Sequence, residues 1–225
     1  NPFSKNSISY NKTGVVFEDS NGYVWVQAGA YIDKFNIKDN NFKHFETGGM
    51  YLSKKGEIWK VNTKGLHRYD ASKDAFLLEI PGYFAMYEDK KGNFWVGTPI
   101  GLCKYDFSSK KFSECISAKT YRLSEDSKGN FWMLIRPQGD TLIQYDPVKR
   151  VYLDTLVLKN AQDHLSNTII IDNHDSIWLG TKNGIFRYSP ISKRLTQFDY
   201  NDGIASNFFR FGLPIKTQKG ELVFG

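Results

Sequence analysis

The stretch E-D-S-K-G-N-F-W-M, from Glu125 to Met133, occurs three times in this chain with few changes. Earlier copies are E-D-K-K-G-N-F-W-V from Glu88 to Val96 and E-D-S-N-G-Y-V-W-V from Glu18 to Val26. Each copy places two acids, two polar residues and a Gly shortly before a Trp. A segment that recurs within one chain marks a repeated supersecondary unit, and this repeat therefore decides the fold.

The tryptophans give the period of the repeat. They are separated by 34, 36, 37 and 46 residues and stand, in order, at Trp25, Trp59, Trp95, Trp132 and Trp178. In the first four copies a Gly lies three residues before the Trp, whereas in the fifth copy Asp175 holds that position. A sixth, partial copy at the end of the chain has Val223 in the Trp position.

Similar segments also follow each Trp, such as G-L-C-K-Y-D (Gly101 to Asp106) and G-I-F-R-Y-S-P (Gly184 to Pro190). Short apolar and aromatic runs cut by Gly, Asn and Asp are typical of β-strands, so each unit is predicted to be four antiparallel strands, a to d, with the Trp on strand b. Such units bury both faces when neighbours pack radially, which predicts an all-β fold, a β-propeller of four-stranded blades. A β-sandwich, the competing all-β fold, would not repeat its sequence at a near-constant period.

The repeat predicts that residues 1–225 form a single propeller segment, and it also predicts where each blade begins and ends. Complete blades are expected at about 15–46, 50–80, 85–117, 121–158 and 168–199, with a partial blade at 211–225. The opening N-P-F-S-K-N-S-I-S-Y resembles the c–d hairpin and d strand of another repeat. We therefore expect five complete blades plus partial blades at both ends, as a fragment of a larger ring of seven blades.

The pattern E-D-x-x-G-x-(F/V)-W-(V/M), followed by G-T-x-x-G-(L/I)-x-x-Y-(D/S), resembles the two-component regulator propeller repeat. The segments Trp95 to Asp106 and Trp178 to Pro190 match it best, whereas the Trp59 copy has W-K-V-N-T and the Trp132 copy lacks the Gly-Thr pair. In that family, such propellers form the periplasmic sensor region of hybrid two-component histidine kinases, and their ligands are mostly oligosaccharides. The resemblance implies a non-catalytic segment of an inner-membrane kinase that senses an oligosaccharide, regulates glycan-utilisation genes and forms a homodimer through the parent protein. The alternatives are a protein-interaction propeller and a propeller lyase-type enzyme.

Composition and charge bear on nucleic-acid binding, membrane contact and the state of the cysteines. The net charge of +6 comes from cations spread through turns such as Lys54-Lys55 and Lys90-Lys91, which predicts a solvated rim and no nucleic-acid binding. No apolar run approaches the roughly 18 residues of a membrane span, so contact with a membrane is expected only through regions outside this segment. Cys103 and Cys115 are expected on neighbouring strands, where a bridge is geometrically possible; we favour two thiols that pack as small apolar groups.

The repeated acids and tryptophans are interpreted as scaffold. An Asp at the start of a β-turn accepts backbone amides and the Gly at its end supplies positive φ, while the Trp packs one blade on the next. A calcium site is not expected, because Ser, Asn and Lys occupy the intervening positions. No metal or cofactor site and no catalytic residue is predicted, since the histidines occupy unrelated repeat positions, at His44, His67, His164 and His174.

Ligand binding is instead expected where the repeat is broken. The b–c loop from Ile135 to Asp140 is longer than its counterparts, as are the d–a connections at 159–168 and 200–210. Arginine suits anionic groups and glutamine suits hydroxyls, so the predicted ligand-binding residues are Arg122, Arg136, Gln138 and Arg210. Next to the last of these, Asn207, Phe208 and Phe209 are expected to serve as linker packing.

Overall fold

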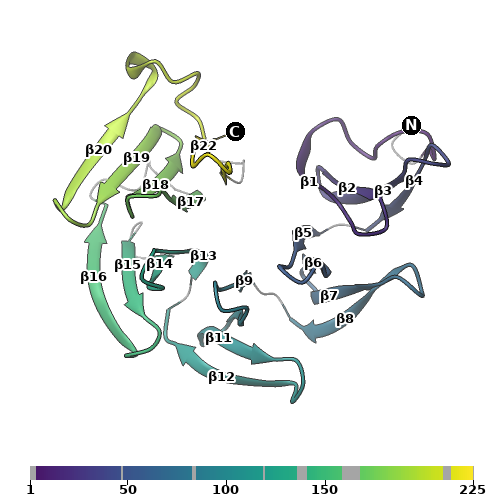
Figure 1. Ribbon diagram of the computed structural model, residues 1–225, viewed down its shortest axis with the longest axis horizontal. Coiled ribbons are helices and arrows are strands. Elements are labelled where there is room, and N and C mark those ends of the chain that lie inside the picture. Colours follow the sequence, from purple (N-terminus) through teal and green to yellow (C-terminus); the bar gives the residue numbers. More distant parts are fainter. Residues whose placement is uncertain are drawn as a thin grey trace. The chain divides into compact units, whose positions relative to one another are not determined.

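The computed structural model describes residues 4–46, 48–82, 85–118, 120–135, 141–158, 168–209 and 214–224. These residues form five four-stranded antiparallel sheets, one two-stranded sheet and a single short 3-10 helix, η2 (Tyr200–Asp202) (Figure 1). The predicted all-β fold with four-stranded propeller blades is confirmed.

Every blade runs a to d in chain order from one edge of its sheet to the other. Blades 1 and 2 consist of β1 (Thr13–Glu18), β2 (Tyr23–Ala28), β3 (Tyr31–Asn36), β4 (Asn41–Phe45), β5 (Gly49–Leu52), β6 (Ile58–Asn62), β7 (Gly65–Asp70) and β8 (Ala75–Pro81). Blade 3 consists of β9 (Met86–Glu88), β10 (Phe94–Thr98), β11 (Gly101–Asp106) and β12 (Lys111–Ile116). Blades 4 and 5 consist of β13 (Thr120–Glu125), β14 (Phe131–Ile135), β15 (Thr141–Asp146), β16 (Val151–Val157), β17 (Thr168–Ile171), β18 (Ile177–Thr181), β19 (Gly184–Ser189) and β20 (Arg194–Phe198).

The chain divides into two compact units, residues 1–88 and 89–225. In the first unit, Trp25 of blade 1 is fully buried and packs edge-on against Tyr69 of blade 2, with ring centroids 4.7 Å apart. In the second, Trp132 of blade 4 is fully buried and packs against Tyr188 of blade 5 at 5.9 Å. The repeated Trp therefore joins consecutive blades, and the Tyr near the end of strand c is its partner.

The acidic turn has the predicted backbone role and a second one that the sequence did not reveal. In the first copy, Asp19 Oδ1 accepts the amides of Asn21 (2.9 Å) and Tyr23 (3.1 Å), and Gly22 has φ of 80°. The other carboxylate oxygen, Oδ2, accepts the indole N–H of Trp25 at 2.8 Å. The same indole bond recurs between Trp95 and Asp89 (3.0 Å), Trp132 and Asp126 (3.3 Å), and Trp178 and Asp172 (2.8 Å). One carboxylate thus fixes both the turn and the orientation of the core Trp.

The first acid of the pair joins one blade to the next. Glu88, at the end of β9, accepts the turn amide of Lys54 from blade 2 at 2.7 Å. Glu125, at the end of β13, likewise accepts the amide of Lys90 from blade 3 at 2.6 Å. These bonds explain why the repeat has two adjacent acids, because each acid serves a different turn.

The fifth copy makes the same connection from another position. Ile171 stands where three of the other four copies have Glu and blade 2 has Leu52, and the carboxylate is supplied by Asp175, which replaces the turn Gly. Asp175 accepts the amide of Ser127 from blade 4 at 2.8 Å and has φ of 58°, a value that the missing Gly would adopt more readily. The fifth copy therefore departs from the repeat in where its carboxylate stands, but this carboxylate still bonds the turn amide of the preceding blade.

The turn carboxyls make stability depend on pH in a defined direction. Burial raises the pKa of Asp172, but hydrogen bonds from Trp178 and from two backbone amides lower it further, so the net pKa is below its ordinary value. Because the unfolded value is about 3.9, the contribution is present above about pH 4 and is lost as pH falls through the folded pKa. We expect the free energy of unfolding, measured by urea titration, to be constant above about pH 5 and to fall below about pH 4. Asp172→Asn should show a shallower fall; an equal fall in both proteins would contradict this assignment.

The ends of the chain differ from each other. Residues 215–223 form β21 (Ile215–Lys216) and β22 (Leu222–Val223), which pair as strands a and b of a further repeat. The expected d strand at the N-terminus is wrong for the described residues, because 4–10 contain no strand. Instead, the carbonyl of Lys5 accepts the amide of Phe42 on the outer strand β4 at 2.7 Å. The segment is held by hydrogen bonds to blade 1, so it does not form a ladder of its own.

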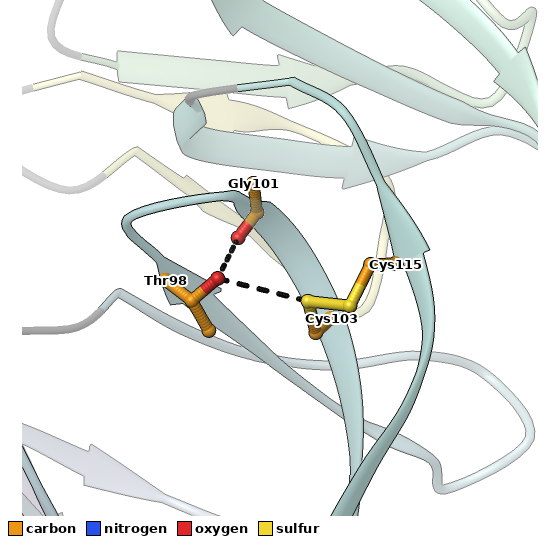
Figure 2. The surroundings of a disulfide bond; sticks show 4 residues. All are labelled: Thr98, Gly101, Cys103 and Cys115. Atoms are coloured by element: carbon orange, nitrogen blue, oxygen red, sulfur yellow. Dashed lines mark hydrogen bonds between the residues drawn. A yellow bond between two sulfur atoms is a disulfide. The ribbon is translucent and has the colours of Figure 1, made fainter.

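Our preference for two free thiols is also wrong, because Cys103 and Cys115 form a disulfide between β11 and β12 (Figure 2). The reason is a β-bulge in β12. Cys103 pairs with Cys115, whereas the next residue, Lys104, pairs with Ser113, so Glu114 is an extra residue with φ of 46°. Without the bulge, the register set by Lys104 and Ser113 would place Glu114 opposite Cys103. Directly paired side chains lie on one face of a sheet, which puts the two sulfurs within bonding distance.

Reducing the disulfide is expected to lower the free energy of unfolding by about 2 kcal/mol, because a cross-link over 12 residues restricts the unfolded chain. Urea unfolding of the wild-type chain with and without a thiol reductant measures the effect. The double variant Cys103→Ala/Cys115→Ala should have the lower stability and no response to reductant. A wild-type midpoint that reductant leaves unchanged would contradict the prediction.

Candidate ligand-binding face

The antiparallel order of each blade puts its loops at two ends. The b–c turn and the d–a connection lie at one end, named here the b–c end, and the a–b and c–d turns lie at the other, the a–b end. The predicted ligand-binding loops all belong to the b–c end. This end of the blades is therefore the candidate face.

Where the repeat is regular, the Gly-Thr pair closes the b–c turn. Thr98 Oγ1 donates to the carbonyl of Gly101 at 2.9 Å, as Figure 2 shows, and Thr181 does the same to Gly184 at 2.9 Å. These hydroxyls are used within the turn itself. The regular b–c turns are thus short, and their Thr hydroxyls are hydrogen-bonded within the turn. The connections that depart from the pattern are better candidates for ligand binding.

Of the four predicted ligand residues, the structure places one. Arg122 is exposed on β13 and pairs with Leu134, one residue before the end of β14, so it lies near the b–c end. Arg136, Gln138 and Arg210 lie outside the described residues. Their grouping with Arg122 therefore stays a prediction.

The d–a connection after blade 5 is described up to residue 209 and has a defined conformation. Asp199 caps η2, with its carboxylate accepting the amide of Asn201 and its own amide donating to the carboxylate of Asp202. Gly203 follows in the left-handed region with φ of 89°. The Asn207 side chain accepts the amide of Tyr200 at 2.6 Å, which closes the loop across seven residues.

This connection presents two aromatic rings to solvent. Tyr200 is 68% exposed and Phe208 is 48% exposed. The predicted packing role holds for two neighbours, because the Asn207 carbonyl accepts the amide of Gly184 and Phe209 is buried. Phe208 differs from that expectation, since about half of its surface is exposed to solvent. The sequence could have indicated these exposed rings, because the enlarged connection contains several aromatic residues.

The histidines do not form a catalytic arrangement among the described residues. His44 Nδ1 lies 2.8 Å from Asp33 Oδ1 and 2.9 Å from Ser9 Oγ, and its Nε2 lies 3.1 Å from the Ser4 carbonyl. A nucleophilic serine would need the ring nitrogen opposite the one held by the carboxylate, and Ser9 is also buried. This Ser-His-Asp group ties the N-terminal segment to blade 1.

The remaining histidines are placed apart. His174 is exposed in an a–b turn, and His164 lies outside the described residues. His67 is buried on β7 beside a second buried polar residue, Lys60 on β6. Sequence reasoning missed this pair. The available signal was the residue after each Trp, which is apolar in the other four complete blades: Val26, Val96, Met133 and Leu179.

Two clefts lie at the a–b end, one in each unit, with volumes of about 450 and 270 Å³. Both lie between consecutive blades and include an acidic turn, Asp19 in one and Asp89 in the other. Their recurrence makes them a feature of the repeated scaffold. Within the described ranges, no group of three or more His, Cys, Asp or Glu could hold a metal ion, and no helix is long and apolar enough to cross a membrane.

The fold and the repeated Asp-Trp turn define this chain as a segment of a β-propeller. Residues 80–99 match the family described as Two component regulator propeller. The match runs from β8 through the acidic turn of blade 3 to the end of β10, which confirms the predicted repeat there. A comparison with the curated proteins finds no match.

Several solved structures share the fold. The extracellular domain of the putative one component system BT4673 from B. thetaiotaomicron is 18% identical, with a TM-score of 0.75 over 100% of this chain and 33% of that chain. The extracellular domain of the putative hybrid two component system BT3049 from B. thetaiotaomicron is 16% identical, with a TM-score of 0.54 over 100% and 38%. PorZ, a surface component of the type-IX secretion system of Porphyromonas gingivalis, is 14% identical, with a TM-score of 0.62 over 96% and 38%. The chain thus spans between 33% and 38% of these proteins, and at such identities the likeness establishes the fold.

Proposed function

We propose that this chain is part of the ligand-sensing, extracytoplasmic propeller of a hybrid two-component sensor histidine kinase that recognises an oligosaccharide and regulates glycan-utilisation genes. The observation that carries the proposal is the d–a connection after blade 5, where a hydrogen-bonded loop holds Tyr200 and Phe208 exposed at the b–c end. The match of residues 80–99 to the regulator propeller family supports the sensor class.

The chemistry of the loop suits a sugar. An exposed aromatic ring offers a flat apolar surface on which the C–H face of a pyranose can stack, while nearby carboxylates and amides can bind its hydroxyls. Here Tyr200 lies between Asp199, which caps η2, and Asp202, and Phe208 belongs to the same connection. Because the cap and the Asn207 bond fix the loop in advance, little conformational freedom is lost on binding.

The proposed location is the periplasm, as part of an inner-membrane protein. Two of the similar solved structures are described as extracellular domains. The disulfide supports the same compartment, because Cys115 is exposed on an outer strand and such bonds persist under oxidising conditions. The parent protein would signal as a homodimer, and this segment would bind no nucleic acid.

We propose no catalysis in this segment. The group of buried Ser9 and Asp33 with half-buried His44 supports that view, since its geometry does not present a nucleophile. A propeller that binds only a protein remains the alternative. It predicts complex formation with a protein and no response to any oligosaccharide.

Removing the exposed rings tests the proposal. In a panel of plant and host oligosaccharides, we expect at least one to raise the Tm of the wild-type chain, and Tyr200→Ala or Phe208→Ala to weaken its Kd by about three- to tenfold. Tyr152→Ala is the matched control, because Tyr152 is 51% exposed on the outer strand β16, away from the connection. Absence of any shift across the panel, or equal weakening by the control, would count against the proposal.

A further inference from the structure

Blade 2 contains two polar side chains in its interior. Lys60 is 6% exposed and His67 is 7% exposed, and they pair directly across β6 and β7. In the other four complete blades the position of Lys60 is held by the apolar side chains of Val26, Val96, Met133 and Leu179, which are 9%, 0%, 0% and 0% exposed. A lysine has therefore replaced a core residue at one place in the repeat.

The surroundings of Lys60 are apolar and tightly packed. Its ammonium lies 5.2 Å from the ring centroid of Phe76. Its stem packs on the backbone of Gly48, where a Cβ would come within 2.5 Å of the Lys60 Cγ. Ile58, two residues earlier on the same face of β6, belongs to the Trp25 core cluster. The lysine thus lies on the face of blade 2 that packs against blade 1.

No carboxylate neutralises this lysine among the described residues, because its ammonium forms neither an ion pair nor a hydrogen bond with any of them. Glu46 is exposed and acts only at a distance: burial lowers the pKa of Lys60, Glu46 raises it and Lys64 lowers it. The undescribed residues of this unit, 1–3, 47, 83 and 84, include no acid. The Lys60 ammonium has no counter-ion among the described residues and is not one of their fully buried, unpartnered polar atoms, so it keeps some contact with solvent. An anion that reached it would gain a charge-assisted hydrogen bond.

Lys60 lies near the b–c end of blade 2. Lys60 lies two residues before the end of β6, next to the b–c turn, and Gly48 belongs to the d–a connection between blades 1 and 2. Lys64, exposed in that b–c turn, adds positive charge at this end. Burial and the charge of Lys60 both lower the pKa of His67, which an anion placed beside the two groups would reverse.

We propose that Lys60, with His67 beside it, binds an anionic substituent of the sensed oligosaccharide, a carboxylate or a sulfate ester. This inference rests on the proposed function, because it names the chemical class of the proposed ligand. Lys60 is the charged group that bonds the anionic oxygens, and His67 lies beside it with its Nδ1 facing the carbonyl of Gly65 at 3.2 Å. The ligand would therefore be an acidic sugar.

The experiment compares three galacto-oligosaccharides of equal length with the whole chain: neutral, oxidised to uronates, and sulfated. Calorimetry gives the Kd of each, and NMR of ε-labelled lysines gives the pKa of Lys60. We expect one acidic form to bind about tenfold or more tighter than the neutral form and to raise the Lys60 pKa. Preference for the uronate or for the sulfated form identifies the substituent.

Lys60→Met should abolish the preference while the protein stays folded, since Met133 fills the equivalent position in blade 4. Lys55→Met is the control, because it removes the same charge from an exposed a–b turn of the same blade. Binding of the neutral sugar with no change at Lys60 in any form would overturn the subsite and leave the proposed function standing. A rise in the Lys60 pKa with sodium sulfate, but no binding of any oligosaccharide, would support the subsite and overturn the proposed function.

Discussion

Replacing Asp126 with alanine is expected to lower the free energy of unfolding by about 4 kcal/mol. Asp126 is 3% exposed, and its Oδ1 accepts the amides of Lys128 and Asn130 at 3.0 and 2.9 Å. Its Oδ2 accepts the side-chain N–H groups of Asn130 (3.0 Å), Trp132 (3.3 Å) and Gln144 (2.9 Å). The variant leaves several buried donors without an acceptor, and each such donor costs about 1 kcal/mol or more. Urea unfolding followed by Trp fluorescence measures the loss.

A second aspartate gives the control for this prediction. Asp106 also opens a turn, where it accepts from the amide and hydroxyl of Ser108 at 2.8 and 2.6 Å, but it is exposed. Asp106→Ala should therefore cost under about 1 kcal/mol, because water can satisfy the freed donors. Equal losses in the two variants would show that burial and the indole bond contribute nothing.

The substitution Gly101→Ala is expected to cost about 4 kcal/mol, for a steric reason. Gly101 begins β11 with φ of 138°, and a Cβ there would lie 2.0 Å from the carbonyl oxygen of Ile116 on β12. The neighbouring atom is backbone, so strand d would have to move away from strand c. Thermal and urea unfolding of the variant measure the loss.

Gly56→Ala separates this clash from the cost of the dihedral angle alone. Gly56 has φ of 79°, and a Cβ added there would meet no atom within 4 Å, so alanine should cost only about 1 kcal/mol. Gly65 and Gly184 repeat the close approach of Gly101, at 2.0 and 2.1 Å from the carbonyls of Ile80 and Phe198. If Gly101→Ala proved as mild as Gly56→Ala, strand d would be free to shift. The glycine that opens strand c would then have no steric role.

The repeat was predictable because its determinants are local. The acid, the turn Gly and the Trp lie within seven residues, and each makes its bonds inside the same turn, as Asp19 and Trp25 do. Such a unit leaves its pattern in the sequence however the blades are placed. The first acid of the pair could not be interpreted in the same way, because Glu88 bonds an amide 34 residues away, at Lys54.

The candidate site was only partly predictable, because function lies where the pattern is interrupted. Departure from the repeat identified the connection at 200–210, but not that Tyr200 and Phe208 would face solvent while Phe209 is buried. Which side of a loop is covered depends on its hydrogen bonds, here the cap at Asp199 and the bond from Tyr200 to Asn207. Lys60 could have been found by aligning the residues that follow each Trp.

By itself, the sequence determined the blade: the alternation of short strands, the Asp turn and the Trp that packs on the next blade are set by spacing within each repeat. The tertiary structure decided the contacts between residues far apart in the chain and the pairings that depend on a single residue of register. The extra residue Glu114 places Cys115 opposite Cys103, and the shift of the acid to Asp175 restores the contact to Ser127. A one-residue change of register exchanges the partners along a whole strand pair, and no local pattern records it.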